Sequence, residues 1–159
     1  MLDVGSNTVH LLVVDARRGG HPTPMSSTKA ALRLAEAIDE SGKLTRKGAD
    51  SLVHTIGEFS KIARSSGCAE IMAFATSAVR DATNSDEVLS RVKKETGVDL
   101  AVLSGVNESR LTFLAVRRWY GWSAGRIINL DIGGGSLEMS CGVDEDPTSR
   151  CPCPWGRAG

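Results

Sequence analysis

Short apolar runs bounded by turn residues predict the strands of this chain. The first run, residues 11–14, ends shortly before a Gly-Gly pair, which indicates a strand followed by a turn. The predicted strand segments are residues 1–20 (two strands around a tight turn), 24–35, 69–82 (a strand that becomes a short helix at Thr76 and Ser77), 98–105, and 125–143 (strand, glycine turn, strand).

Apolar residues that recur every three or four positions predict helices between these strands. The helical segments are residues 44–67, 84–97 and 107–122. Thr45 is predicted to cap the first helix and Gly67 to end it, while Ser85 is predicted to cap the second. The apolar side of the first helix is predicted to carry Leu52, Ile56, Phe59 and either Ile62 or Ala63, and one side of the third helix Leu111, Leu114, Ala115 and Arg118.

Paired strands followed by alternating helices and strands indicate an α/β protein with a mixed sheet and helices on its faces. The hydrophobic content of 41% is typical of a soluble globular chain, and no apolar stretch approaches the roughly 20 residues that span a bilayer. Basic and acidic residues balance at 19 each, so no global charge attracts a polyanion. We therefore expect a cytoplasmic protein without a membrane or nucleic-acid partner.

One pattern occurs twice in the chain. The segment DVGSNTVHL, which starts at Asp3, aligns with DIGGGSLEM, which starts at Asp131. In both, an apolar strand ends at an aspartate and is followed by glycine-containing turn residues, a hydroxyl residue and a second strand. Two turns of one design indicate a duplicated module, whereas the triple glycine alone would equally fit a flexible hairpin.

Such turns are suited to binding phosphate. Glycine lets the backbone approach a ligand closely, so that successive N–H groups can converge on an anion, and Thr8 and Ser136 add hydroxyl donors. An aspartate in this position would repel a bare phosphate but can hold a bridging Mg²⁺, and Glu138 lies on the face of its strand where it can join that ion. Neither turn contains the lysine of a Walker A loop.

Two further segments contain candidate residues whose patterns leave alternatives open. Ser77 and Arg80 lie at a predicted strand-to-helix junction, and two interpretations fit this position. In one, the two residues and the helix N-terminus bind an anion. In the other, Thr76 or Ser77 is a plain helix cap and Arg80 is solvated. Glu108 falls in the first turn of a predicted helix, where the macrodipole favours a surface glutamate. The pattern alone does not select Glu108 as a base.

Four segments in order, DVGSNTVHLL, ATSAVRDA, LSGVNESRL and DIGGGSLE, resemble the exopolyphosphatase/guanosine pentaphosphate phosphatase (Ppx/GppA) family, and most closely its actinobacterial members. The resemblance covers residues 1 to about 147. It implies the actin-like ATPase (ribonuclease H-like) superfold, in which duplicated domains each supply a phosphate loop and the active site lies between them. The expected organisation is domain I over residues 1–124, the opening hairpin of domain II over 125–147, and a tail over 148–159.

The resemblance implies a Mg²⁺- or Mn²⁺-dependent hydrolase that removes terminal phosphates from inorganic polyphosphate or guanosine pentaphosphate (pppGpp). It assigns the general base to Glu108 and the metal to Asp3, Asp131 and Glu138. The phosphate-binding residues that it implies are Gly5, Ser6, Asn7, Thr8, Ser77, Arg80, Gly133, Gly134, Gly135 and Ser136. Full-length members often form homodimers. The alternatives are an ATP-dependent kinase or ATPase of the same superfold, and a non-catalytic module that binds polyphosphate or guanosine phosphates.

The chain departs from the family pattern at both ends and near Glu108. Met1 stands almost against Asp3, and Val106 and Asn107 replace residues that are often acidic in the family. Residues 148–159 match neither the family nor any regular element, and we hypothesise a frameshift near Pro147. On this basis we expect a truncated chain with impaired activity and marginal order after about residue 142.

Overall fold

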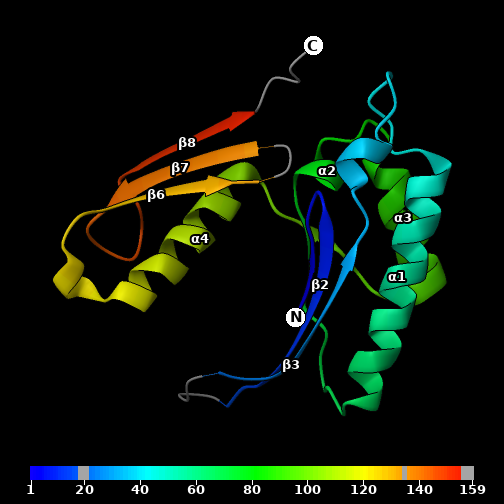
Figure 1. The fold of residues 1–159 in the computed structure, drawn as a ribbon, viewed down its shortest axis with the longest axis horizontal. Coiled ribbons are helices and arrows are strands. Elements are labelled where there is room, and N and C mark those ends of the chain that lie inside the picture. The colour runs from blue at the N-terminus through cyan, green and yellow to red at the C-terminus, as the bar shows by residue number, and fades with distance from the viewer. Residues whose placement is uncertain (18–21, 134–135, 155–159) are drawn as a thin grey trace. The chain divides into compact units, whose positions relative to one another are not determined.

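A computed structural model describes residues 1–17, 22–133 and 136–154 (Figure 1). The chain forms two compact units, Met1–Val102 and Leu103–Gly159. This division precedes the expected boundary after residue 124, because the helix that follows Val102 packs on the strands of the second unit.

The first unit is built on a five-stranded mixed sheet with the strand order β3-β2-β1-β4-β5. Its strands are β1 (Leu2–Val4), β2 (Thr8–Asp15), β3 (Thr23–Ala31), β4 (Ala73–Ala75) and β5 (Ala101–Val102). β1 pairs antiparallel with β2 and parallel with β4, so it is central. The expected α/β class with a mixed sheet is confirmed, although the strand predicted over residues 98–105 is shortened to two residues.

Helices α1 (Arg46–Ser65) and α3 (Ser85–Thr96) pack side by side beside this sheet, and η1 (Leu34–Ala37) and α2 (Ser77–Arg80) are short (Figure 1). The predicted apolar side of α1 is buried at Leu52, Ile56, Phe59 and Ala63, whereas Ile62 is exposed. Thr45 caps α1 as predicted, because its side chain accepts a hydrogen bond from the N–H of Gly48 at 3.2 Å. The buried apolar side chains of α1 belong to the core, together with the alternate residues Val9, Leu11 and Val13 of β2.

The predicted cap of α3 is wrong by one residue. Asn84, not Ser85, is the N-cap, and its side chain does not bond to the helix. Instead, the Asn84 amide accepts from the N–H of Leu44 at 2.9 Å and donates to the carbonyl of Leu44 at 3.1 Å. The start of α3 is therefore joined to the segment before α1 by a contact between residues distant in the sequence.

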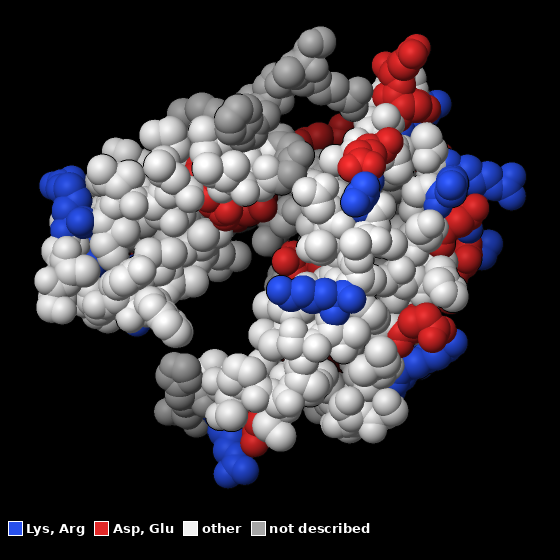
Figure 2. Space-filling view, viewed as in Figure 1, with Lys and Arg blue, Asp and Glu red and all other residues white. Residues whose placement is uncertain are grey.

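Basic and acidic side chains are interspersed over α1 and α3 (Figure 2). Arg91 pairs with both Asp50 and Glu95 at 2.7 Å, and Lys61 pairs with Glu58 at 2.7 Å. This face therefore carries both charges, as the balanced composition of the chain does.

The second unit contains a three-stranded antiparallel sheet and one long helix. Its elements are α4 (Gly105–Tyr120), η2 (Trp122–Ala124), β6 (Ile127–Ile132), β7 (Ser136–Gly142) and β8 (Ser149–Pro154), and the strand order is β6-β7-β8. Among the described residues, no helix is long and apolar enough to cross a bilayer.

The buried side of α4 is not the side that carries Leu111 and Arg118. Leu111 and Arg118 are exposed, while Phe113 and Arg117 are fully buried. The guanidinium of Arg117 donates to the carbonyls of Gly121 at 3.2 Å, Gly125 at 2.6 Å and Gly142 at 3.1 Å. A charged residue can lie on the buried side here because three backbone carbonyls accept hydrogen bonds from its two Nη groups, although its Nε–H has no partner among the described residues.

The two faces of this sheet have opposite character. Asp131, Glu138 and Ser140 share the face on which α4 packs, and Glu138 and Ser140 are buried there. On the other face, Ile128 and Ile132 are each 69% exposed. Helices usually cover the apolar face of a sheet, so a polar covered face points to a functional site.

Strand β8 corrects the expectation that residues 148–159 contain no regular element. It pairs antiparallel with β7 from Ser149 to Pro154 at the edge of the sheet. Proline fits an edge strand where its nitrogen faces away from the partner, and alternate residues share that direction. Pro152 and Pro154 are two residues apart and so are compatible with one free edge.

Candidate functional site

The two repeated segments form hairpins that close in the same way. In the first, the N–H of Gly5 donates to the carbonyl of Thr8 at 2.9 Å, and in the second the N–H of Gly133 donates to the carbonyl of Ser136 at 2.9 Å. The preceding aspartates, Asp3 and Asp131, occupy corresponding strand positions. Gly134 and Gly135, also predicted to bind phosphate, lie outside the described residues.

Backbone carbonyls of the first loop accept hydrogen bonds from the segment that follows β3. The Asn7 carbonyl accepts from the N–H groups of Leu32 and Arg33, both at 2.9 Å, and the Ser6 carbonyl accepts from Ala35 at 3.0 Å. The side chains of Asn7 and Thr8 are exposed. A Cβ on Gly5 would meet the Thr8 carbonyl at 3.2 Å, so a larger residue there would require the backbone of the turn to shift by a few tenths of an ångström.

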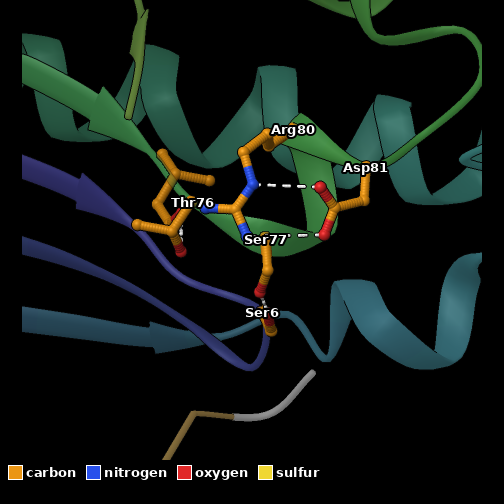
Figure 3. A network of polar contacts seen from close by, with 6 residues as sticks. Ser6, Thr76, Ser77, Arg80 and Asp81 are labelled. Atoms are coloured by element: carbon orange, nitrogen blue, oxygen red, sulfur yellow. Dashed lines mark hydrogen bonds and ion pairs between the residues drawn. The ribbon is translucent and has the colours of Figure 1, made fainter. Parts of the chain in front are cut away.

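Ser6 connects the first loop to the start of α2. The buried hydroxyls of Ser6 and Ser77 are 2.7 Å apart, and Arg80 pairs with Asp81 with an Nε–Oδ1 distance of 2.9 Å (Figure 3). The structure thus brings together Ser6, Ser77 and Arg80, three predicted site residues. Thr76 is the N-cap of α2 but its side chain forms no cap bond, and this four-residue helix contributes little dipole.

Asp3 is the middle residue of β1, which ends just before the loop, and it lies opposite His10 on β2. Burial raises the pKa of the Asp3 carboxyl, and the charge of the nearby His10 ring partly offsets that rise. A partly desolvated carboxylate is stabilised by a cation, so the environment of Asp3 is compatible with its predicted role near a metal ion.

In the second unit, Asp131 and Glu138 are direct neighbours on paired strands. Both side chains point to the face covered by α4, where Glu138 is only 2% exposed. Within the described residues neither carboxylate forms an ion pair, and like charges directly opposite each other on a sheet repel. This pair therefore provides a negatively charged position that a cation would stabilise.

Glu108 lies in the first turn of α4, as predicted. Ser104 caps the helix by accepting from the N–H of Asn107 at 3.2 Å, and the Glu108 side chain is half-buried. One helical turn further, Thr112 donates a hydrogen bond to the carboxylate of Asp131 at 3.2 Å. Residues four apart share one side of a helix, so Glu108 is on the side of α4 that meets Asp131.

Sequence reasoning missed Thr112. The available signal was its position four residues after Glu108, but this spacing has meaning only once the partner strand is known. Sequence reasoning also missed Asp81, although it directly follows Arg80.

The carboxylate oxygens of Asp131 and Glu138 are the ligand type that Mg²⁺ prefers. Within residues 1–17, 22–133 and 136–154, no three His, Cys, Asp or Glu side chains gather closely enough to hold an ion alone. Substrate oxygens and water commonly complete magnesium coordination, so two carboxylates fit such an ion.

The repeat also differs between the two units. His10 and Glu138 occupy equivalent positions opposite the aspartates Asp3 and Asp131. The first aspartate therefore faces a group that can carry positive charge, and the second faces another acid. A bound cation would therefore stabilise the acidic pair of the second unit more than the aspartate of the first unit.

Together, the mixed sheet, the duplicated hairpins and the helices define an α/β protein of the actin-like ATPase superfold. The Ppx/GppA phosphatase family matches residues 13–157, and the chain belongs to this family. The matched range includes most of the segment that sequence analysis set apart as a tail.

Similar proteins have been found by sequence and by structure. The chain is 77% identical over 156 residues to exopolyphosphatase 1 of Mycobacterium tuberculosis and 78% identical to exopolyphosphatase 1 of Mycobacterium leprae, covering 98% of this chain but 45% and 46% of those proteins. An exopolyphosphatase structure from Cytophaga hutchinsonii superimposes with a TM-score of 0.89 at 29% identity, covering 98% of this chain and 49% of that one. The chain thus spans about half the length of these relatives.

Proposed function

We propose that this chain forms part of a metal-dependent phosphohydrolase that removes terminal phosphates from inorganic polyphosphate or pppGpp. The observation that supports this most directly lies within the second unit. There, Glu108 and Thr112 share one side of a helix, and Thr112 binds Asp131, which faces Glu138. A candidate base and two candidate metal ligands are thereby held on interacting elements. The exopolyphosphatase names of the relatives support polyphosphate as the substrate class.

The two hairpins bind phosphate in this proposal. Exposed Asn7 and Thr8 offer donors at the first turn, and Arg80 supplies positive charge beside it. The N–H groups of Gly5 and Gly133 close the hairpins, so backbone donors to phosphate would come from the other residues of each turn. Phosphoryl transfer depends chiefly on positioning and on neutralising the charge of the equatorial oxygens, which this set of groups provides.

Glu108 orients and deprotonates the attacking water. The backbone of Glu108 is fixed in the first turn of α4, where its N–H donates to the carbonyl of Ser104 at 2.9 Å. A half-buried carboxylate with a fixed backbone can accept a proton in one defined place.

Asp131 and Glu138 would hold Mg²⁺ or Mn²⁺ in the second unit, and Asp3 is the candidate metal ligand of the first unit. When bound, such an ion offsets the negative charge of the phosphate groups. Thr112 keeps the Asp131 carboxylate in position through its hydroxyl.

We expect the Thr112→Val variant to bind Mn²⁺ about tenfold more weakly, because outer-shell hydrogen bonds orient metal ligands. Calorimetric titration with Mn²⁺ measures this, and Thr112→Ser should restore the affinity since it keeps the hydroxyl. Equal Mn²⁺ affinity in Thr112→Val and the unmodified protein would show that Thr112 does not support a metal ligand.

The function is tested by offering polyphosphate, pppGpp and ATP separately, with and without Mg²⁺, and measuring binding and released phosphate. Phosphate release from polyphosphate or pppGpp that requires Mg²⁺ is the expected result. Binding of these polyanions without release would favour a non-catalytic module. A preference for ATP with adenosine as a competitor would favour a kinase or ATPase. The exopolyphosphatase 1 of M. tuberculosis serves as the parallel reference in the same assay.

A further inference from the structure

Asp81 lies beside the only cationic side chain that the proposed phosphate site draws from the first unit. The two residues are adjacent in sequence, and their side chains meet edge to edge. Nε of Arg80 is 2.9 Å from Oδ1 of Asp81, and an Nη atom of Arg80 is 3.4 Å from Oδ2. Two parallel contacts of this kind fix the plane of the guanidinium.

The pair is anchored to the first loop through the backbone of α2. The N–H of Asp81 donates to the carbonyl of Ser77 at 2.9 Å, and the Ser77 hydroxyl contacts the hydroxyl of Ser6 at 2.7 Å. Figure 3 shows the Ser6–Ser77 contact and the Arg80–Asp81 pair near each other at α2. The position of Asp81 therefore depends on the same residues that shape the loop.

The two side chains differ in exposure. The Arg80 side chain is 19% exposed, whereas that of Asp81 is 62% exposed. The Asp81 carboxylate is accessible to solvent and lies next to the Arg80 guanidinium, which is the group that a phosphate would bind. An incoming phosphate must therefore compete with a carboxylate that already binds Arg80.

We propose that Asp81 is a positioning residue that limits the affinity of the site for polyanions. Its carboxylate orients the Arg80 guanidinium and offsets its charge, so a phosphate chain is bound in a defined geometry but is released readily. This inference rests on the proposed function, since it assigns a role within the same phosphate site.

The Asp81→Asn variant separates the two roles, because an amide oxygen can still accept from Nε while the negative charge is lost. We expect it to bind inorganic tripolyphosphate about two- to fivefold more tightly, since an ion pair whose carboxylate is exposed is worth up to about 1 kcal/mol. Its affinity should also fall more steeply with salt, because one more positive charge is available to the anion. A merely structural role of Asp81 would not produce tighter binding.

Tripolyphosphate binding is measured by calorimetry on the whole chain over a range of NaCl concentrations, with thermal unfolding to verify folding. Asp99→Asn is the matched control, because Asp99 also pairs with a basic residue of this unit, Lys93, at 2.8 Å, and its removal changes the net charge equally. Arg80→Gln and the double variant Arg80→Gln/Asp81→Asn complete a cycle. The gain in affinity should vanish when Arg80 is absent.

Unchanged or weaker binding by Asp81→Asn, or a gain that persists in the Arg80→Gln background, overturns this role while the proposed function stands. Failure of the unmodified chain to bind tripolyphosphate overturns both. If Asp81→Asn unfolds, Asp81→Glu provides the second test. Its longer side chain keeps the charge, so affinity should stay within about twofold of the unmodified chain if charge is the cause.

Discussion

Replacing Glu108 with glutamine is expected to reduce phosphate release from polyphosphate by at least about 100-fold, because general-base catalysis typically contributes 10²–10⁴-fold. Glutamine has nearly the same shape, and the Glu108 backbone is bonded to the Ser104 carbonyl, so α4 should keep its structure. Polyphosphate binding should persist, since the hairpin residues bind the anion in this proposal. Phosphate release and binding are measured on the same preparation of the protein in its active form.

Glu145→Gln is the control for this substitution. Glu145 belongs to the same unit and pairs with Arg118 at 3.2 Å at the surface, so its loss changes the charge equally without touching the proposed site. Equal phosphate release by Glu108→Gln and Glu145→Gln would remove Glu108 from the mechanism. Loss of binding together with turnover in Glu108→Gln would place it in substrate binding instead.

The second large effect is expected at Arg117. Replacing this buried side chain with methionine leaves the carbonyls of Gly121, Gly125 and Gly142 without their donor. It also removes a guanidinium that lies 5.8 Å from the centre of the Phe113 ring. An unsatisfied buried polar group costs about 1–3 kcal/mol, and of these carbonyls only that of Gly142 belongs to a buried residue, so we expect the free energy of unfolding of the second unit to fall by about 2–4 kcal/mol.

Urea unfolding measures this effect, followed by far-UV circular dichroism together with tryptophan fluorescence, because Trp119 and Trp122 are already 84% and 54% exposed in the folded unit. Trp119 and Trp122 lie in the described part of the second unit, and residues 1–102 contain no tryptophan. Arg118→Met is the matched control, because Arg118 is the next residue and its side chain is 62% exposed. We expect a change below about 0.5 kcal/mol for the control, as for most surface substitutions. Similar unfolding midpoints for the two variants would contradict a stabilising role of Arg117.

Features that depend on neighbouring residues were predicted well from the sequence. Thr45 caps α1, the strand β4 gives way to a helix at Ser77, and the two aspartate-led turns close through equivalent hydrogen bonds. Each of these contacts joins residues within a few positions, so the sequence contains all the groups that decide it.

Features that depend on distant partners were missed. The Asn84 side chain binds Leu44 instead of its own helix, because the backbone groups of Leu44 are brought to it by the packing of α1 and α3. Helical spacing indicates which residues of α4 share a side, but not which side meets the sheet. Arg117 was not considered for the core because only the folded chain supplies the carbonyls that bind it.

The sequence by itself determined the α/β class, the duplicated hairpins and the family, because these follow from local periodicity, turn chemistry and motif order. The tertiary structure alone decided that Thr112 supports Asp131, that Ser6 meets Ser77, and that Asp81 orients Arg80. The first two contacts join residues from separate elements, and the third depends on rotamers that packing selects. Contacts of these kinds are set by the folded geometry, and spacing along the sequence does not by itself specify the partner.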